Sequence, residues 1–230
     1  MFKIIFSVAL LAGFLSGVGI SLVQEFTTTP LILHAEEFEN ADIQAHAGEA
    51  RESKNATEWE PVNRLERFAY TALANIVVGV GFALLLVASF VLYGGDVRGR
   101  SGVIWGIAGF AIFTLSPGLG LPPELPGSFA AELSARQGWW LAAALSAAMG
   151  LWLMIFRDGW IFNGAGLLIM VLPHIIGAPH PPDFGGLVPA ELAGQFTAAS
   201  MVSMAIFWVM LGWLSGTFYQ RFSAEIETET

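Results

Sequence analysis

The chain has 230 residues, of which 55% are hydrophobic and only 13% are charged, and its formal net charge is −9. A soluble domain carries about twice that share of charged residues, so the composition excludes an ordinary soluble protein and indicates a chain surrounded by lipid. The acidic balance argues against nucleic acid as a partner, because phosphates would repel it. The absence of cysteine excludes disulfides, thiolate metal sites and cysteine nucleophiles.

Six stretches are long and apolar enough to cross a bilayer, which takes roughly 20 residues of helix. None contains Asp, Glu, Lys or Arg, and we expect them at about residues 4–24, 68–93, 101–121, 137–156, 159–178 and 192–220. The first could be a signal peptide, but its apolar run is longer than a signal core and no small-residue cleavage pattern follows it directly. We therefore predict an all-α polytopic membrane helix bundle of about six transmembrane helices, forming a single membrane domain over residues 1–230.

The charges between these spans predict the orientation of the chain, because short cytoplasmic loops tend to hold Lys and Arg. One side of the membrane collects short connections that carry Lys3, Arg98, Arg100, Arg157 and Arg221. The other side collects an acidic loop at residues 25–67 and the loops near residues 122–136 and 179–191, which also hold five basic residues in total. Because the short loops decide, we expect both termini in the cytoplasm and the acidic loop outside it.

Three pairs of glycines are spaced four residues apart within the spans, at Gly13/Gly17, Gly102/Gly106 and Gly212/Gly216. This spacing lets two helix backbones approach closely. For any single pair, the alternative interpretation is that glycine is simply common in membrane helices.

Two stretches of the sequence resemble each other and predict an internal repeat. Residues 102–109 and 159–166 open two spans with similar glycine-rich sequences, and the spans run on to Pro117 and Pro173. A Pro-x-Glu-Leu-x-Gly-x-Phe sequence then follows in each copy, beginning at Pro122 and at Pro189. Because two spans separate the copies, both start on one side, which makes a parallel repeat of helix hairpins related by an axis along the membrane normal. The first span, followed by Pro30, could be a third and more diverged copy.

Six residues are candidate metal ligands on the acidic side or at its membrane border: His174, His180, Glu124, Glu191, His34 and Glu37. Imidazole and carboxylate together suit borderline divalent ions such as cobalt, nickel and zinc. The two later histidines flank a Gly/Pro-rich break, where non-helical backbone is tolerated only against protein or a cavity. The two repeat-related glutamates reach the same depth, and His34 and Glu37 share a face if their segment is helical. The alternatives are interfacial hydrogen bonding for the histidines and helix capping for Glu124 and Glu191.

The sequence lacks the motifs of common enzymes. It has no GxxxxGK[ST] phosphate loop, no HExxH and no GxSxG, so no ATPase or common hydrolase machinery is built in. We see no nucleophile or acid–base pair within the spans. We therefore expect no catalytic residues and no enzyme.

A run of motifs along the chain is specific when taken together, and it lies at residues 3–15, 30–36, 119–126, 135–140, 172–181, 188–192 and 207–208. These motifs resemble those of the CbtA family of predicted cobalt transporter subunits, and the resemblance covers nearly the whole chain except about residues 40–64. It implies a protein of the bacterial inner membrane that is linked to cobalt supply for cobalamin synthesis. It also implies a small single-span partner, CbtB, with a histidine-rich tail. The doubled acid Glu36-Glu37 and the long insert after it depart from the family pattern.

The leading functional hypothesis is a membrane subunit of a cobalt uptake system that captures the ion on its acidic outer face. Cobalt(II) would be the transported ion, and no resident cofactor is expected. The alternative is a structural subunit that scaffolds a partner and binds no ion itself. Few polar residues lie within the spans, among them Asn75, Asn163 and Thr71, so a path across the membrane favours a homo-oligomer or a partner.

Overall fold

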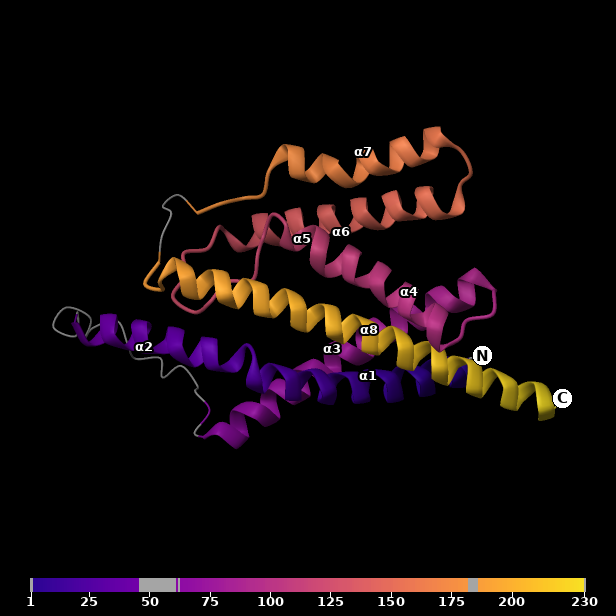
Figure 1. Cartoon of the computed structure of the whole chain (residues 1–230), viewed down its shortest axis with the longest axis horizontal. Helices are drawn as coiled ribbons and strands as arrows, with labels where there is room; N and C mark the ends of the chain where they lie inside the picture. The colour runs from indigo at the N-terminus through magenta and orange to yellow at the C-terminus, as the bar shows by residue number, and fades with distance from the viewer. Residues whose placement is uncertain (1, 46–60, 62, 182–185, 230) are drawn as a thin grey trace. The chain divides into compact units, whose positions relative to one another are not determined.

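The computed structural model describes residues 2–45, 61, 63–181 and 186–229 (Figure 1). Among these residues the regular structure is helical, and the β-pairing is a single isolated antiparallel bridge between Ser128 and Gly186. The all-α prediction is therefore confirmed. The chain divides into two compact units: unit 1 is Met1–Thr27, Glu58–Phe110 and Val202–Thr230, and unit 2 is Thr28–Thr57 and Ala111–Met201.

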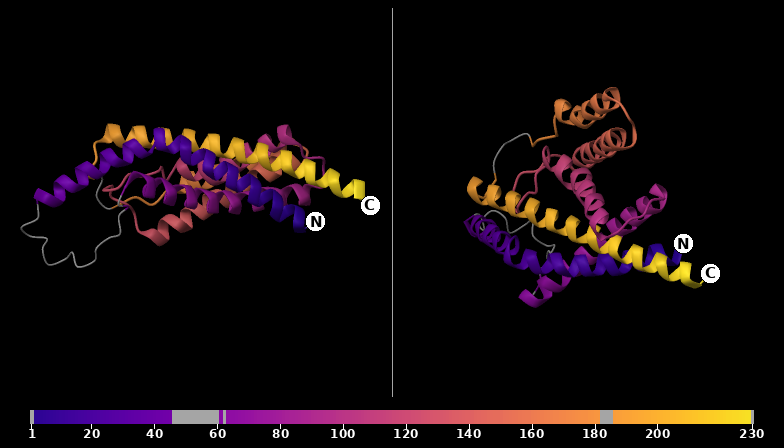
Figure 2. Two further views of the ribbon diagram at one scale, coloured as in Figure 1. Left: turned by 90° about the horizontal axis from the view of Figure 1, so that it is seen from below. Right: turned by 45° about the vertical axis from the view of Figure 1, so that its right-hand side comes forward.

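Unit 1 contains three helices and most of a fourth: α1 (Phe2–Phe26), α3 (Arg64–Tyr93), α4 (Gly99–Phe110) and α8 (Ala190–Glu229) from Val202 onward. Unit 2 contains α2 (Thr29–Ala45), the π-helical turn η2 (Ala111–Leu115), α5 (Ser116–Gly118), α6 (Leu133–Phe156), α7 (Trp160–Ile176) and the start of α8. Figure 2 shows α8 as one uninterrupted helix.

Within the described part of the chain, five helical stretches are long and apolar enough to cross a membrane: Phe2–Phe26, Arg64–Tyr93, Gly99–Gly118, Leu133–Phe156 and Ala190–Ala224. Each coincides with a span expected from the sequence. The expected span at residues 159–178 corresponds to α7, which has only 17 residues. At 1.5 Å per residue its length is about 26 Å, close to the lower limit for a crossing. Five long spans are thus present, and a sixth crossing by α7 stays a prediction.

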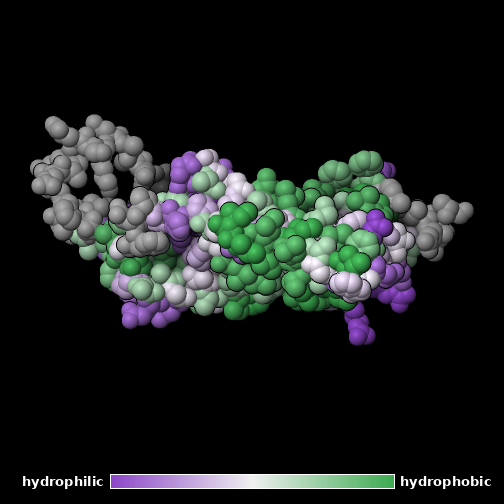
Figure 3. All heavy atoms as spheres, turned by 90° about the horizontal axis from the view of Figure 1, so that it is seen from above, coloured by the Kyte–Doolittle hydropathy of each residue, from purple (hydrophilic) through white to green (hydrophobic). Residues whose placement is uncertain are grey.

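Large apolar side chains are exposed along the middle of these helices. Val77 on α3, Ile104 on α4 and Leu168 on α7 are 63%, 66% and 63% exposed. Figure 3 shows hydrophobic side chains over much of the drawn face. Water would not tolerate so much exposed apolar surface, so these side chains face lipid.

In unit 1, glycines bring the helix backbones into contact, as the spacing predicted. A methyl group added at Gly13 would overlap the backbone of Val80 on α3, and one at Gly17 would come within 2.5 Å of the Ile76 Cα. On the other side of the unit, Gly102 of α4 meets the carbonyl of Gly212 on α8. Such close approach maximises van der Waals contact between helices in lipid.

In unit 2, α6 and α7 form an antiparallel pair (Figure 1). A methyl group added at Gly166 would come within 2.7 Å of the Gly150 carbonyl oxygen. The turn between the two helices includes Gly159, whose φ of 115° is a conformation that favours glycine. Small residues on facing turns therefore join these helices.

The start of the expected acidic loop at residues 25–67 is a helix in the structure. Helix α2 places Leu31, Ile32, Ala35 and Phe38 on one stripe, at the spacing of an amphipathic helix. The stripe packs on Leu125 and Leu192, with Ala35 fully buried between them. Burial of this stripe against the rest of unit 2 explains the helix. Residues 46–60 and 62 of the expected loop lie outside the described part of the chain.

The two copies of the predicted repeat have different local structures. The first passes through η2 and α5 and then has no regular helix from Gly120 to Glu132. The second is a helix up to Ile176, and its Pro-x-Glu-Leu sequence begins α8. Nevertheless, the equivalent residues Leu125 and Leu192 are both buried in one cluster. The parallel repeat itself stays a prediction.

Candidate functional site

All six candidate ligands predicted from the sequence belong to unit 2. His34 and Glu37 lie on α2, Glu124 on the segment between α5 and α6, His174 in the last turn of α7, His180 beyond that helix, and Glu191 in the first turn of α8.

His174 is half-buried beside a break in a neighbouring helix. Its Nε2 lies 3.4 Å from the Oγ of Ser116, a side chain that is 8% exposed. The Ser116 hydroxyl also lies 3.4 Å from the carbonyl oxygen of Ala143 on α6. The Trp139 ring meets the imidazole edge-on at 5.5 Å between centroids. The imidazole is therefore held by α5 and α6 as well as by its own helix.

Two prolines explain why the backbone is irregular at this point. Pro117 follows the π-helical turn η2, and Pro173 lies inside α7. Proline has no N–H to donate, so it interrupts the hydrogen bonds of a helix. The carbonyl of Pro173 accepts hydrogen bonds from Gly177 N at 3.0 Å and from Trp139 Nε1 at 3.3 Å. π-Helical turns of this kind are frequent at functional sites, which makes the Ser116–His174 contact the best-formed candidate site in unit 2.

Glu124 is paired with a cation. Its carboxylate lies 2.8 Å from the guanidinium of Arg136, and the two side chains are 30% and 31% exposed. Its neighbour Pro123 accepts a hydrogen bond from Thr197 Oγ1 of α8 at 3.2 Å. A metal ion that used Glu124 as a ligand would have to compete with Arg136 for the carboxylate.

The other candidate ligands are more exposed. The His34 ring lies 5.4 Å from that of Phe38 on the same helix, and Glu37 and His180 are exposed. Glu191 is exposed in the first turn of α8, where the helix dipole favours a carboxylate. The alternative interpretation of Glu191, as a residue that stabilises a helix N-terminus, is consistent with this position.

No group of three or more His, Asp or Glu side chains able to hold a metal ion occurs among the described residues. The structure therefore brings His174 to Ser116 and Glu124 to Arg136, and it does not gather the predicted ligands around one point. Asp183, in the loop between the two histidine positions and α8, lies outside the described residues. The six-residue ligand set stays a prediction.

The N-cap of α6 is Glu132, which the sequence analysis did not single out. Its carboxylate accepts hydrogen bonds from the backbone N–H groups of Ser134 and Ala135, both at 3.0 Å, and from the Ser134 hydroxyl. These bonds, the one from the Ser134 side chain first, lower the pKa of Glu132 below its ordinary value. The position of this acid immediately before a long apolar run is the sequence signal that could have predicted its role as an N-cap.

Unit 1 contains a polar cluster that sequence reasoning recognised only as scattered polar residues. Asn75 Nδ2 of α3 donates to Ser21 Oγ at 2.9 Å and to Gln24 Oε1 at 2.6 Å, both on α1. The sequence alone could not predict that these three side chains meet. The register between α1 and α3 is set by glycine contacts that only the fold reveals.

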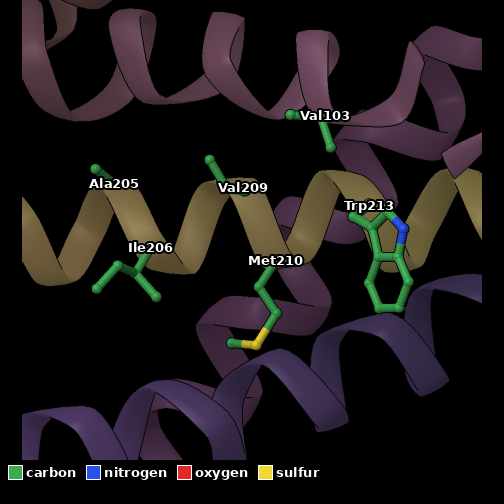
Figure 4. A pocket seen from close by; sticks show the side chains of 6 residues that line it. All are labelled: Val103, Ala205, Ile206, Val209, Met210 and Trp213. Carbon is green, nitrogen blue, oxygen red and sulfur yellow. The ribbon is translucent and has the colours of Figure 1, made fainter. Parts of the chain in front are cut away.

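An apolar groove opens between α4 and α8 in unit 1 (Figure 4). It has a volume of about 560 Å³ and is lined by Val103, Ala205, Ile206, Val209, Met210 and Trp213. These side chains offer no carboxylate or imidazole, so the groove suits an acyl chain or an apolar helix rather than an ion.

The long apolar helices and their exposed hydrophobic surfaces define a multi-pass membrane protein. The family described as "Probable cobalt transporter subunit (CbtA)" matches residues 2–220, and the chain belongs to this family. Comparison with curated proteins and with solved structures found no match.

Proposed function

We propose that this chain is the membrane subunit of a cobalt(II) uptake system in the bacterial inner membrane, linked to cobalamin synthesis. The observation that carries the proposal is the family match over residues 2–220. The protein would bind and pass the ion rather than catalyse a reaction. Both termini would lie in the cytoplasm, and unit 2 would present its histidines and glutamates to the outside.

His174 is the residue we place first on the route of the ion. Its imidazole can supply a neutral nitrogen ligand, which suits cobalt(II), and Ser116 fixes its orientation at 3.4 Å. His180 lies six residues further on, beyond the end of α7. A hydrated ion could exchange between the exposed His180 and the half-buried His174.

Replacing His174 and His180 together with alanine tests this proposal. Removing even an outer-shell partner of a metal ligand costs about 10- to 100-fold, so losing both imidazoles should lower cobalt uptake at least about tenfold. Uptake of radioactive cobalt by cells that express equal amounts of membrane-inserted protein is the measurement.

The matched control is His46→Ala, which removes a histidine that is not among the predicted ligands. It should leave uptake unchanged. Parent-like uptake by the His174/His180 double variant would reject the histidine route.

A small single-span partner with a histidine-rich segment would complete the system, since the family is described as a subunit. The groove of Figure 4 could receive an apolar helix of such a partner. Co-purification of a CbtB-like protein with the parent, weakened by Ala205→Trp, would support this assembly. Assembly of several copies of the chain is the other arrangement that could complete a path.

A structural role is the second candidate function. It is favoured by one observation, namely that the described residues contain no group of three or more metal-ligating side chains. A scaffold would hold the partner without binding an ion. Calorimetric titration of the purified protein with cobalt, nickel and zinc separates the two functions, because a scaffold gives no binding heat with any of these ions.

A further inference from the structure

The apolar groove of unit 1 has the size of a site for one ligand molecule. Its volume of about 560 Å³ falls within the range of roughly 300–1,000 Å³ that is usual for such sites. The lining on α8 runs from Ala205 to Trp213, which is about 12 Å of helix at 1.5 Å per residue. A helical segment of that length is about 10–12 Å across with its side chains and fills more space than the groove offers. The groove therefore follows a single acyl chain more closely than it follows a helix.

The lining of the groove is apolar along its length and open to lipid at the side. Ile206 and Val209 are 42% and 41% exposed, and Figure 4 shows Val209 between Ala205 and Trp213 along α8. In a bilayer, an apolar surface gains no hydrophobic free energy by meeting another apolar surface, because the lipid tails are equally apolar. The groove thus provides shape and van der Waals contact, and selectivity for one kind of lipid must come from a charged group.

A basic residue lies at one end of the groove. A methyl group added at Gly99, the first residue of α4, would come within 3.2 Å of Trp213 Nε1, so the start of α4 lies beside Trp213. Arg100 is the next residue and is exposed. It precedes Val103 of the groove lining by three residues, which makes the two side chains neighbours on the helix surface. The guanidinium group is therefore placed at the Trp213 end of the groove.

The charge of Arg100 is not neutralised by any described residue. Arg98, two positions earlier, pairs with Asp96 at 2.5 Å, whereas Arg100 has no ion pair within the described part of the chain. Trp213 adds an indole N–H at the same end, and indole rings favour the headgroup layer of a membrane. A phospholipid has the complementary pattern, an apolar chain joined to a phosphate, and basic sites between transmembrane helices bind anionic headgroups.

We propose that the groove between α4 and α8 is a binding site for one anionic phospholipid. An acyl chain lies along Ile206, Val209 and Val103, and the phosphate lies at Arg100 with the indole N–H of Trp213 beside it. A zwitterionic lipid presents the same phosphate together with a cationic group that Arg100 repels, so a lipid with net negative charge is preferred. A partner helix that docked in the same groove would replace this lipid.

Native mass spectrometry of the full chain, purified in mild detergent without a partner, tests the site. The probes are phosphatidylglycerol and phosphatidylcholine with identical acyl chains, so that only the headgroup differs. The parent should bind phosphatidylglycerol about fivefold more tightly, the advantage expected of one basic residue at a membrane surface. Arg100→Gln should abolish this preference and Arg100→Lys should keep it. Ala205→Trp places an indole in the groove and should weaken the binding of both lipids.

Two matched controls change charge and bulk elsewhere. Arg157→Gln removes a cation of unit 2 that lies over the Trp152 ring, and Val77→Trp adds an indole to the exposed face of α3. Neither should change the binding of either lipid. Equal binding of the two lipids by the parent, or a preference that survives in Arg100→Gln, would overturn the assignment of Arg100 to the phosphate.

A helix as the occupant gives a different result. If Arg100→Gln and Ala205→Trp leave lipid binding unchanged while Ala205→Trp weakens co-purification of a single-span partner, the groove holds the partner's helix and the lipid site is wrong. Since no measurement on the lipids involves cobalt, the outcome is independent of whether the chain takes part in cobalt uptake.

Discussion

At the scale of single residues, the polar side chains of unit 2 fall into different roles. His174 is held by Ser116 and Trp139, Glu124 by Arg136, and Glu132 by the first N–H groups of α6. Similar carboxylates therefore do different things, depending on which donor the fold places beside them. Glu132 offers the clearest test, because its pKa is shifted and it lies outside the spans.

We expect the first turn of α6 to loosen in acid. The folded-state pKa of Glu132 is lowered, so its capping contribution is fully present above the ordinary glutamate pKa and is lost as the pH falls through the lower folded value. Hydrogen-exchange protection of the Ser134 and Ala135 amides should follow this titration. In Glu132→Gln, protection should be weaker and independent of pH in that range. A pH response that persists in the glutamine variant would assign the effect to another group.

At the scale of helices, glycines decide which pairs can pack. The α1–α3, α4–α8 and α6–α7 contacts all pass through positions where a methyl group would meet backbone. The apolar side chains of the different helices are similar in character. They make each helix soluble in lipid but do not determine which other helix it packs against. Backbone proximity at glycine supplies that choice.

Gly102→Ala should therefore destabilise unit 1. The new methyl group would overlap the carbonyl of Gly212, and overpacking of this kind costs about 1–3 kcal/mol. Gly81→Ala is the matched control on α3, because nothing lies within 4 Å of a methyl group there; it should be neutral or slightly stabilising. Thermal unfolding in detergent measures both. Equal stability of the two variants would contradict the α4–α8 contact.

At the scale of the whole molecule, orientation in the membrane is the property that links the two units to the direction of ion movement. Five of the basic residues lie in the short connections and near the chain ends on one side, which favours the cytoplasm. This assignment decides from which side of the membrane an ion would reach the histidines of unit 2.

Reporter fusions test the orientation. Fusions within residues 40–60 should be active outside the cytoplasm, and fusions within residues 95–100 and 225–230 should be active inside it. The expected pattern follows from the positions of the short basic loops. A cytoplasmic signal from residues 40–60 would reverse the assignment.

The sequence by itself determined the helical class and the glycine pairs at the helix contacts of unit 1, and it predicted six spans, five of which are long apolar helices in the described part of the chain. These properties depend on local composition: apolar length fixes a span, and a missing side chain permits close approach whichever partner arrives. The family, too, was recognisable from motifs along the chain.

Only the tertiary structure decided which residues meet. It made residues 29–45 a helix, because Ala35 is buried against Leu125 and Leu192, which lie about 90 and 157 residues away along the chain. It also joined Asn75 to Ser21. Such contacts depend on the register between helices, and that register is set by packing between segments far apart in sequence rather than by the residues of either helix alone.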